Sequence, residues 1–161
     1  MDERDKALTP QEQLIQSLII DGKSYKQIAA QLGITVDTAR RHGSRIKRKS
    51  ELASTNALAC IDLPATQIRQ LLLALPASPP LTNTELIVLG LVCHGHSAKQ
   101  IARIRAGNAR TVEKHRHNAM AKLGIRSARQ LASRVRRQYA ISGTRDEEVA
   151  TYIAVNAAAA E

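Results

Sequence analysis

The feature that most constrains this chain is an internal repeat, in which the second half matches the first at a constant offset without a gap. The run KQIA at residues 26–29 recurs at residues 99–102, and further matches continue on both sides. Matching over about fifty positions is hard to attribute to composition, and two long copies differ from solenoid arrays, which need three or more short units. The repeat therefore predicts two small domains.

Each copy carries the start signals of short helices. Capping boxes, in which Ser or Thr is followed three residues later by Glu or Gln, predict where helices begin. They are Thr9 with Glu12, Ser24 with Gln27, Thr82 with Glu85, and Ser97 with Gln100. Further caps are expected at Thr35 and Asn108 for a third helix, and at Ser54 and Ser127 for a fourth.

The composition favours helices over sheets. Hydrophobic residues make up 43% of the chain, but aromatic residues only 2%, with no Phe and no Trp. A core of Leu, Ile, Val and Ala suits helix packing better than a β-sandwich, and it argues against modules that stack bases on aromatic rings. We expect an all-α fold of two tandem helix-turn-helix domains, each tetrahelical and without a wing, joined by a linker helix.

The repeat and the prolines set the expected boundaries. They are residues 1–60 for the first domain, 61–80 for the linker, 81–140 for the second domain, and 141–161 for a tail of strong helix formers. The linker has a possible helix at 65–75 with an apolar stripe of Ile68, Leu71, Leu72 and Leu75. This stripe either packs against a domain or forms a partner interface. In the tail, Val149, Tyr152, Ile153 and Ala157 either dock on a neighbour or belong to a disordered end.

The charge points to a polyanionic partner. The chain has a formal net charge of +10, and residues 81–140 alone hold 12 basic and 2 acidic side chains. The alternative is a soluble surface with surplus Lys and Arg, and the turn, the capping signals and the duplication together weigh against it. In the third helix of copy one, burial of the stripe Ala39, Gly43, Ile46 and Ser50 turns a row of basic residues outward. The outward row is Arg40, Arg41, Ser44, Arg45 and Arg48.

The motifs of both copies resemble the LuxR/GerE-type helix-turn-helix domain. Copy one has LTPxE at residues 8–12, KQIAxxLxIT at 26–35, and TAxxH at 38–42. Copy two has TVxxH at 111–115 and KLGIxS at 122–127. The resemblance implies that the third helix of each copy enters the major groove of DNA and that the fourth helix forms a dimer contact.

Carried over residue by residue, the resemblance also implies site residues. Base contacts fall on Arg40, Arg41 and Ser44 in copy one and on Glu113, Lys114 and His117 in copy two. Phosphate or positioning contacts fall on Lys26, Thr35, Thr38, His42 and Lys49, and on Lys99, Asn108, Thr111, His115 and Lys122. The exposed basic face of the third helix, taken by itself, adds Arg45, Lys47 and Arg48 to this set.

Copy two departs from this pattern at the turn. Arg105 and Gly107 stand where copy one has the apolar residues Leu32 and Ile34. We expect these two apolar plugs to anchor the turn in the core of copy one, and the loss of each removes burial worth roughly 1.5–3 kcal/mol. Either Ile104 moves in to compensate or the turn is distorted. In copy one, Gly43 weakens its helix by about 1 kcal/mol relative to Ala unless it permits close packing.

Other chemistries find little support. The cluster of Cys93, His94, His96, His115 and His117 invites a metal interpretation, but His115 matches a family position, and Cys93 falls on an expected buried stripe. No phosphate loop or nucleophile–base pair is present, so we expect no enzyme activity and no cofactor. The polar N-terminus and the absence of long apolar runs predict a cytoplasmic, nucleoid-associated protein.

The sequence thus predicts a transcriptional regulator that binds double-stranded DNA in a sequence-specific manner. A homodimer through the fourth helix or the linker helix, and a contact with RNA polymerase or another regulator, are further expected partners. The alternative is a protein-interaction module, an antiactivator or docking protein on the same scaffold, that would use Leu71, Leu72 and Leu75.

Overall fold

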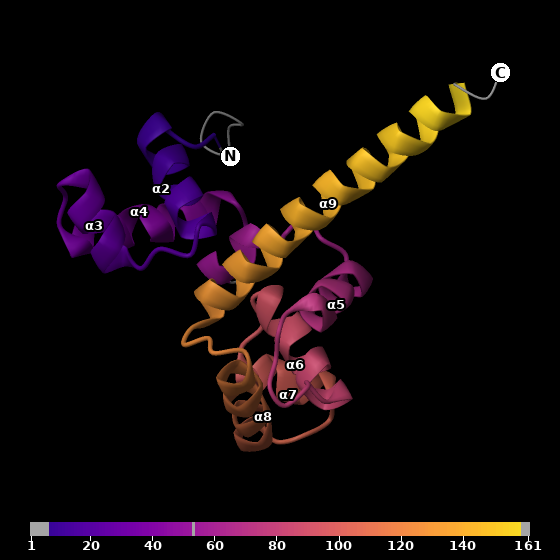
Figure 1. Cartoon of the computed structure of the whole chain (residues 1–161). Coiled ribbons are helices and arrows are strands. Elements are labelled where there is room, and N and C mark those ends of the chain that lie inside the picture. The colour runs from indigo at the N-terminus through magenta and orange to yellow at the C-terminus, as the bar shows by residue number, and fades with distance from the viewer. Residues whose placement is uncertain (1–6, 53, 159–161) are drawn as a thin grey trace.

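The structure, a computed structural model, describes residues 7–52 and 54–158, with side chains described as far as residue 143. Over these ranges it contains α-helices, one 3-10 helix and no strand (Figure 1), so the all-α prediction is confirmed. Copy one contains α2 (Pro10–Ile20), α3 (Tyr25–Leu32), α4 (Val36–Lys49) and the 3-10 helix η1 (Thr55–Ala59). The rest contains α5 (Ala65–Ala74), α6 (Asn83–Cys93), α7 (Ala98–Ile104), α8 (Ala109–Lys122) and α9 (Ala128–Ala158).

The helices begin where the capping signals place them. All four capping boxes form, with both the side-chain and the backbone hydrogen bond of each present. The hydroxyl of Thr35 accepts from the N–H of Thr38 at 3.1 Å, and Asn108 caps α8 by accepting from the N–H of Arg110 at 2.8 Å. Ser54 caps a 3-10 helix in place of the fourth α-helix of copy one.

Two aliphatic cores meet within the chain. The core of copy one holds Ile15, Ile28, Ala39 and Ile46 and ends at Leu58. The second core begins at Ala59 and takes in α5, α6, α7, α8 and the first turns of α9. The chain therefore passes from one core to the other between Leu58 and Ala59.

The apolar stripe of the linker helix packs into the second core. Ile68, Leu71, Leu72 and Leu75 are all buried, so the expectation that α5 packs against a domain is confirmed. Its use as a partner interface through Leu71, Leu72 and Leu75 is wrong, because these side chains are enclosed by the chain itself.

None of the described helices combines the length and the apolar character that a membrane span requires.

Helix α9 joins the two copies. It continues the fourth helix of copy two into the tail as far as Ala158. Its first turns contact η1 and α2 of copy one, while α6 of copy two contacts η1. Its C-terminal half extends beyond the packed helices (Figure 1). The proposed docking of Val149, Tyr152, Ile153 and Ala157 lies outside the described side chains.

Candidate nucleic-acid interface

Helix α4 presents a basic ridge to solvent. Its inner face is formed by Ala39, Gly43 and Ile46, which are buried against α2 and α3. The remaining face carries exposed side chains, and these are Arg40, Arg41, Ser44, Arg45, Lys47 and Arg48. The outward direction of the predicted base-contact residues of copy one is therefore confirmed, although their contacts with DNA stay a prediction.

The ridge keeps its positive charge. Asp37 is the one acidic residue of α4, and its carboxylate lies 3.7 Å from the guanidinium of Arg41. Both side chains are more than 70% exposed, at 72% and 79%, so this ion pair contributes little and is readily exchanged for another anion. The ridge thus remains available to a polyanion.

The turn before α4 has the geometry of a helix-turn-helix. Gly33 adopts a left-handed conformation with φ of 64°, which an L-residue with a Cβ disfavours. The N–H of Ile34 then donates to the carbonyl oxygen of Ala29 at 3.1 Å and closes the turn. Leu32 and Ile34 pack against the core of copy one, and this packing holds α3 and α4 at a fixed angle.

Copy two keeps this turn without its apolar plugs. Ala106 stands at the position of Gly33 with φ of 49°, and the N–H of Gly107 donates to the carbonyl oxygen of Ala102 at 2.8 Å. Ile104 is 58% exposed. The first expected alternative is therefore wrong, because Ile104 has not moved into the core. The second is supported before the closing bond: α7 ends at Ile104, one residue earlier than α3 under the repeat offset, and the N–H of Ala106 donates to Arg103 where that of Gly33 donates to Ala29.

Helix α8 presents a less basic face. Val112 and Ala119 face the core, and the three predicted base-contact residues, Glu113, Lys114 and His117, are exposed. The carboxylate of Glu113 lies 3.1 Å from the guanidinium of Arg116. This face therefore combines an acidic, a basic and an imidazole side chain, in contrast to the arginine ridge of α4.

The comparison with known families agrees with this geometry. The model for bacterial regulatory proteins of the luxR family (GerE) matches residues 6–61 and, separately, residues 79–135. The chain belongs to the luxR family. Each match covers one copy of the repeat, with α4 and α8 as the third helices of the two luxR-type domains.

A curated relative is named as a transcriptional regulatory protein. The chain is 41% identical over 58 residues to the transcriptional regulatory protein MctR of Rhizobium johnstonii. The match covers 36% of this chain and 27% of MctR, so it spans about a quarter of that relative. No solved structure matches the chain.

Two predicted phosphate contacts are instead internal ion pairs of the luxR-type domains. The Nζ of Lys49 lies 2.8 Å from Oε2 of Glu12, and the Nζ of Lys122 lies 2.8 Å from Oε2 of Glu85. The glutamates are buried, and the lysine side chains are only 16% and 18% exposed. Because each ammonium is held inward by a buried carboxylate, we correct the assignment of both lysines to phosphate binding.

The same pairs perturb the glutamates. Burial alone would raise the pKa of Glu12, but its hydrogen bonds to Lys49 and to the N–H of Thr9, with the charge of Lys49, hold that pKa below its usual value. The pKa of Glu85 is lowered through Lys122 and Thr82 in the same way. Each pair ties the start of a first helix to the end of a third helix, and so fixes the position of the third helix.

The remaining predicted positioning residues lie around the two turns. Lys26, Thr35, Lys99, Asn108 and Thr111 are exposed, while Thr38, His42 and His115 are partly buried. The Nδ1 atom of His42 is buried and has no hydrogen-bond partner among the described residues. For all of these side chains the contact with phosphate stays a prediction.

A tight contact between helices explains Gly43. A Cβ atom on Gly43 would collide with the ring and hydroxyl of Tyr25, so the close-packing interpretation of this glycine is confirmed. The offset of the repeat pairs Tyr25 with Ala98 and Gly43 with Arg116. The large and small residues have thus changed places between the copies.

The sequence analysis missed two arginines of α9 that contact copy one and the linker. Arg129 of α9 donates to the carbonyl oxygen of Lys23 at 2.8 Å, and its guanidinium lies 4.4 Å from the ring centroid of Tyr25. Arg136 contacts Asp62 at 2.9 Å and lowers the pKa of that carboxyl. The general excess of arginine between residues 126 and 137 is the one sign of them in the sequence. Their partners, Lys23, Tyr25 and Asp62, lie far away in the chain.

The residues of the metal hypothesis have other surroundings. Cys93 is buried, as expected, and the Nε2 of His94 lies 3.2 Å from the carbonyl oxygen of Leu63. Contact with the Cys60 thiol and burial together raise the pKa of the Cys93 thiol. Among the described residues, no group of three or more His, Cys, Asp or Glu side chains is placed to hold a metal ion.

Proposed function

We propose that this luxR-family chain is a transcriptional regulator that binds double-stranded DNA in a sequence-specific manner. The observation that carries the proposal is the basic ridge of α4, which stands opposite a fully buried face and follows a well-formed turn. An α-helix fits the major groove, and the guanidinium groups of Arg40 and Arg41 match the hydrogen-bond acceptors on guanine edges. Lys26, Arg45, Lys47 and Arg48 would neutralise phosphates around this helix. A cytoplasmic, nucleoid-associated location belongs to the same proposal.

A selection from random duplexes followed by anisotropy titrations tests the proposal. We expect log K to fall linearly with log salt concentration. Arg40→Ala and Arg41→Ala should each weaken binding to the selected site by about tenfold or more and relax its sequence preference. Arg69→Ala is the matched control, since Arg69 is an exposed arginine on α5 that donates to Asn83. Equal losses in all three variants would contradict base reading by α4.

We further propose that one chain acts as a covalent pseudo-dimer. The fourth elements of the two copies, η1 and α9, contact each other, α9 reaches α2, and η1 reaches α6. Under the repeat offset the last two contacts correspond to each other, as in an approximate two-fold arrangement. Two linked reading heads lengthen the site and raise the effective concentration of the second head.

Footprinting tests this arrangement. Two protected clusters are expected from one chain per duplex, with the second lost in Lys114→Ala and His117→Ala. A single cluster that neither substitution alters would contradict a reading role for copy two. A mass measurement of the complex tests the other proposed partners: a mass of two chains per duplex would favour a homodimer, and RNA polymerase added to the mixture tests a polymerase contact.

A further inference from the structure

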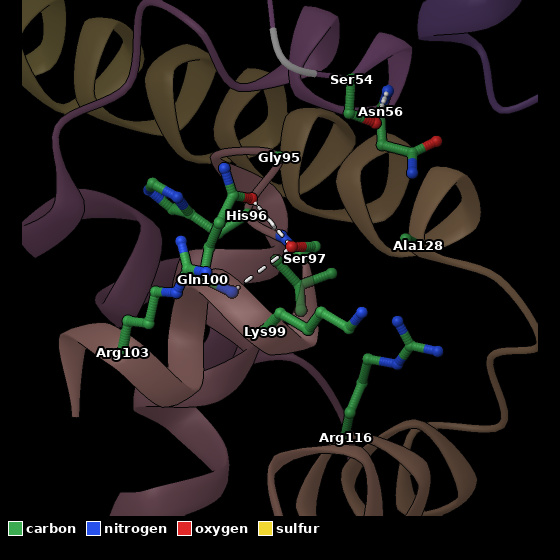
Figure 2. Close-up of a pocket in the computed structure, with 11 residues that line it drawn as sticks. Ser54, Asn56, Gly95, His96, Ser97, Lys99, Gln100, Arg103, Arg116 and Ala128 are labelled. Atoms are coloured by element: carbon green, nitrogen blue, oxygen red, sulfur yellow. Dashed lines mark hydrogen bonds between the residues drawn. The ribbon is translucent and has the colours of Figure 1, made fainter. Parts of the chain in front are cut away.

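A basic cavity lies at the junction of the two copies. Its volume is about 530 Å³, and it opens between η1 of copy one and α6, α7, α8 and the start of α9 of copy two. Figure 2 shows Lys99 and Arg116 extending into the same space from α7 and α8, with Asn56 of η1 on the opposite side. A cavity of this size is within the range of small-molecule sites, roughly 300–1,000 Å³.

The charge of the lining selects for an anion. The cavity is lined by the basic side chains Lys99, Arg103 and Arg116, and by His96. No acidic side chain is among the described residues that line it. Arg116 forms an ion pair with Glu113, which does not line the cavity. The side chains of the pair are 38% exposed for Arg116 and 50% for Glu113. An incoming oxyanion therefore meets three cations without having to displace a buried carboxylate.

The repeat offset gives the equivalent place in copy one to Arg129. There its guanidinium donates to the carbonyl oxygen of Lys23 and lies 4.4 Å from the ring centroid of Tyr25. Under the repeat offset Arg129 corresponds to Asn56, and Tyr25 corresponds to Ala98. Two smaller residues thus leave the copy-two side open.

The open side also carries two cations that copy one lacks. Arg116 stands at the position of Gly43, and Arg103 stands at the position of Ala30. The copy-two side thus has Asn56 in place of an arginine, but it carries the basic side chains Arg103 and Arg116 on its wall. A protein cation in this space, such as Arg129 in copy one, would be repelled by Arg103 and Arg116. A multivalent anion would be attracted to them.

We propose that this cavity binds a small phosphorylated molecule. Its phosphate oxygens would accept hydrogen bonds from Arg103 and Arg116, whose planar guanidinium groups suit bidentate contacts with phosphate. Because η1 comes from copy one and the basic residues come from copy two, an occupied cavity connects the two domains. The ligand would therefore stabilise one relative arrangement of α4 and α8.

Calorimetric titration with inorganic pyrophosphate at physiological ionic strength tests the proposal. Saturable binding with a Kd below about 1 mM is expected for the full chain. Arg103→Gln and Arg116→Gln should each weaken it by about tenfold. Arg69→Gln is the matched control, because Arg69 is an exposed arginine on α5 outside the cavity; the same charge is lost, and affinity should change less than about twofold.

The outcomes separate specific binding from general attraction to a basic chain. Absence of saturable binding, or equal losses in the three variants, overturns the proposal. Loss of duplex affinity in Arg103→Gln and Arg116→Gln without any pyrophosphate binding would assign the cavity to DNA phosphates, and it also overturns the proposal. Thermal unfolding of each variant without ligand checks its fold. The titration contains no DNA, so its result is independent of the proposed regulatory function.

Discussion

Lys49 and Glu12 form an ion pair with an N–O distance of 2.8 Å, and their repeat equivalents, Lys122 and Glu85, form a pair with the same distance. In each domain this pair joins the capping box of the first helix to the last turn of the third. The glutamate also receives the N–H of Thr9 or Thr82. Removing the carboxylate therefore removes hydrogen bonds from both a lysine and a cap.

We expect Glu12→Gln to lower the free energy of unfolding by about 2 kcal/mol at neutral pH. The folded-state pKa of Glu12 lies below its usual value, so the pair stabilises the fold fully above the unfolded pKa, ~4.3, and this contribution is lost as pH falls through the folded pKa. Urea titrations between pH 7 and pH 3 should show the difference between the two proteins shrinking with acidity.

Glu113→Gln is the control for this experiment. Glu113 also pairs with a cation, Arg116, but it is 50% exposed, so its loss should change stability by less than about 0.5 kcal/mol. A difference between Glu12→Gln and the native chain that stays constant down to pH 3 would contradict the role given to the ionised carboxylate.

Ala106→Gly should stabilise copy two. Ala106 has φ of 49°, a conformation that costs an L-residue with a Cβ about 1 kcal/mol more than glycine. Gly33→Ala in copy one is the reciprocal change and should destabilise by a similar amount, since nothing lies within 4 Å of the added Cβ and only the backbone conformation opposes it. Thermal unfolding checks both; a lower melting temperature for Ala106→Gly would show that the turn of copy two differs from that of copy one.

Gly43→Ala should destabilise the chain by about 1–3 kcal/mol, although alanine is the better helix former. The reason is the contact with Tyr25, whose ring and hydroxyl occupy the space of the new Cβ. In a Tyr25→Ala background the same substitution should become neutral or stabilising. A double-mutant cycle measured by urea unfolding gives the coupling; additive effects of the two substitutions would exclude the collision.

Arg129→Ala should loosen the junction between the copies. The change removes a 2.8 Å hydrogen bond to the carbonyl oxygen of Lys23 and a cation–π contact with Tyr25, together worth about 2 kcal/mol. Calorimetry should show unfolding that is broader or split into two transitions. Arg126→Ala, an exposed arginine just before α9, should leave a single transition, and identical traces for the two variants would contradict a joining role for Arg129.

Local signals in the sequence predicted most of the helix boundaries and the exposed ridge. The caps at Thr9, Ser24 and Thr82 act over three residues, so they are readable without knowledge of the fold. The helical period of 3.6 residues likewise sufficed to predict that Ala39 and Ile46 are buried. These features depend on short-range geometry alone.

Long-range partners explain what the sequence analysis missed. Lys49 resembles any lysine on a basic helix, and only the fold reveals that Glu12 lies beside it. Ile104 is exposed because α7 ends there and backbone hydrogen bonds close the turn without the apolar plugs of copy one. The role of Arg129 depends on Lys23 and Tyr25, which lie more than a hundred residues away.

The passage between the cores at Leu58 and Ala59 has a consequence for how this protein can change. A fragment that stops after copy one would keep its own core, from Ile15 to Leu58, and one that starts at Ala59 would keep the second core. Each would lose only the cover that the other half provides, which α9 gives to α2 and η1, and η1 gives to α6. The two halves therefore have separate interiors, and a change in one constrains the other only at the surfaces where they touch.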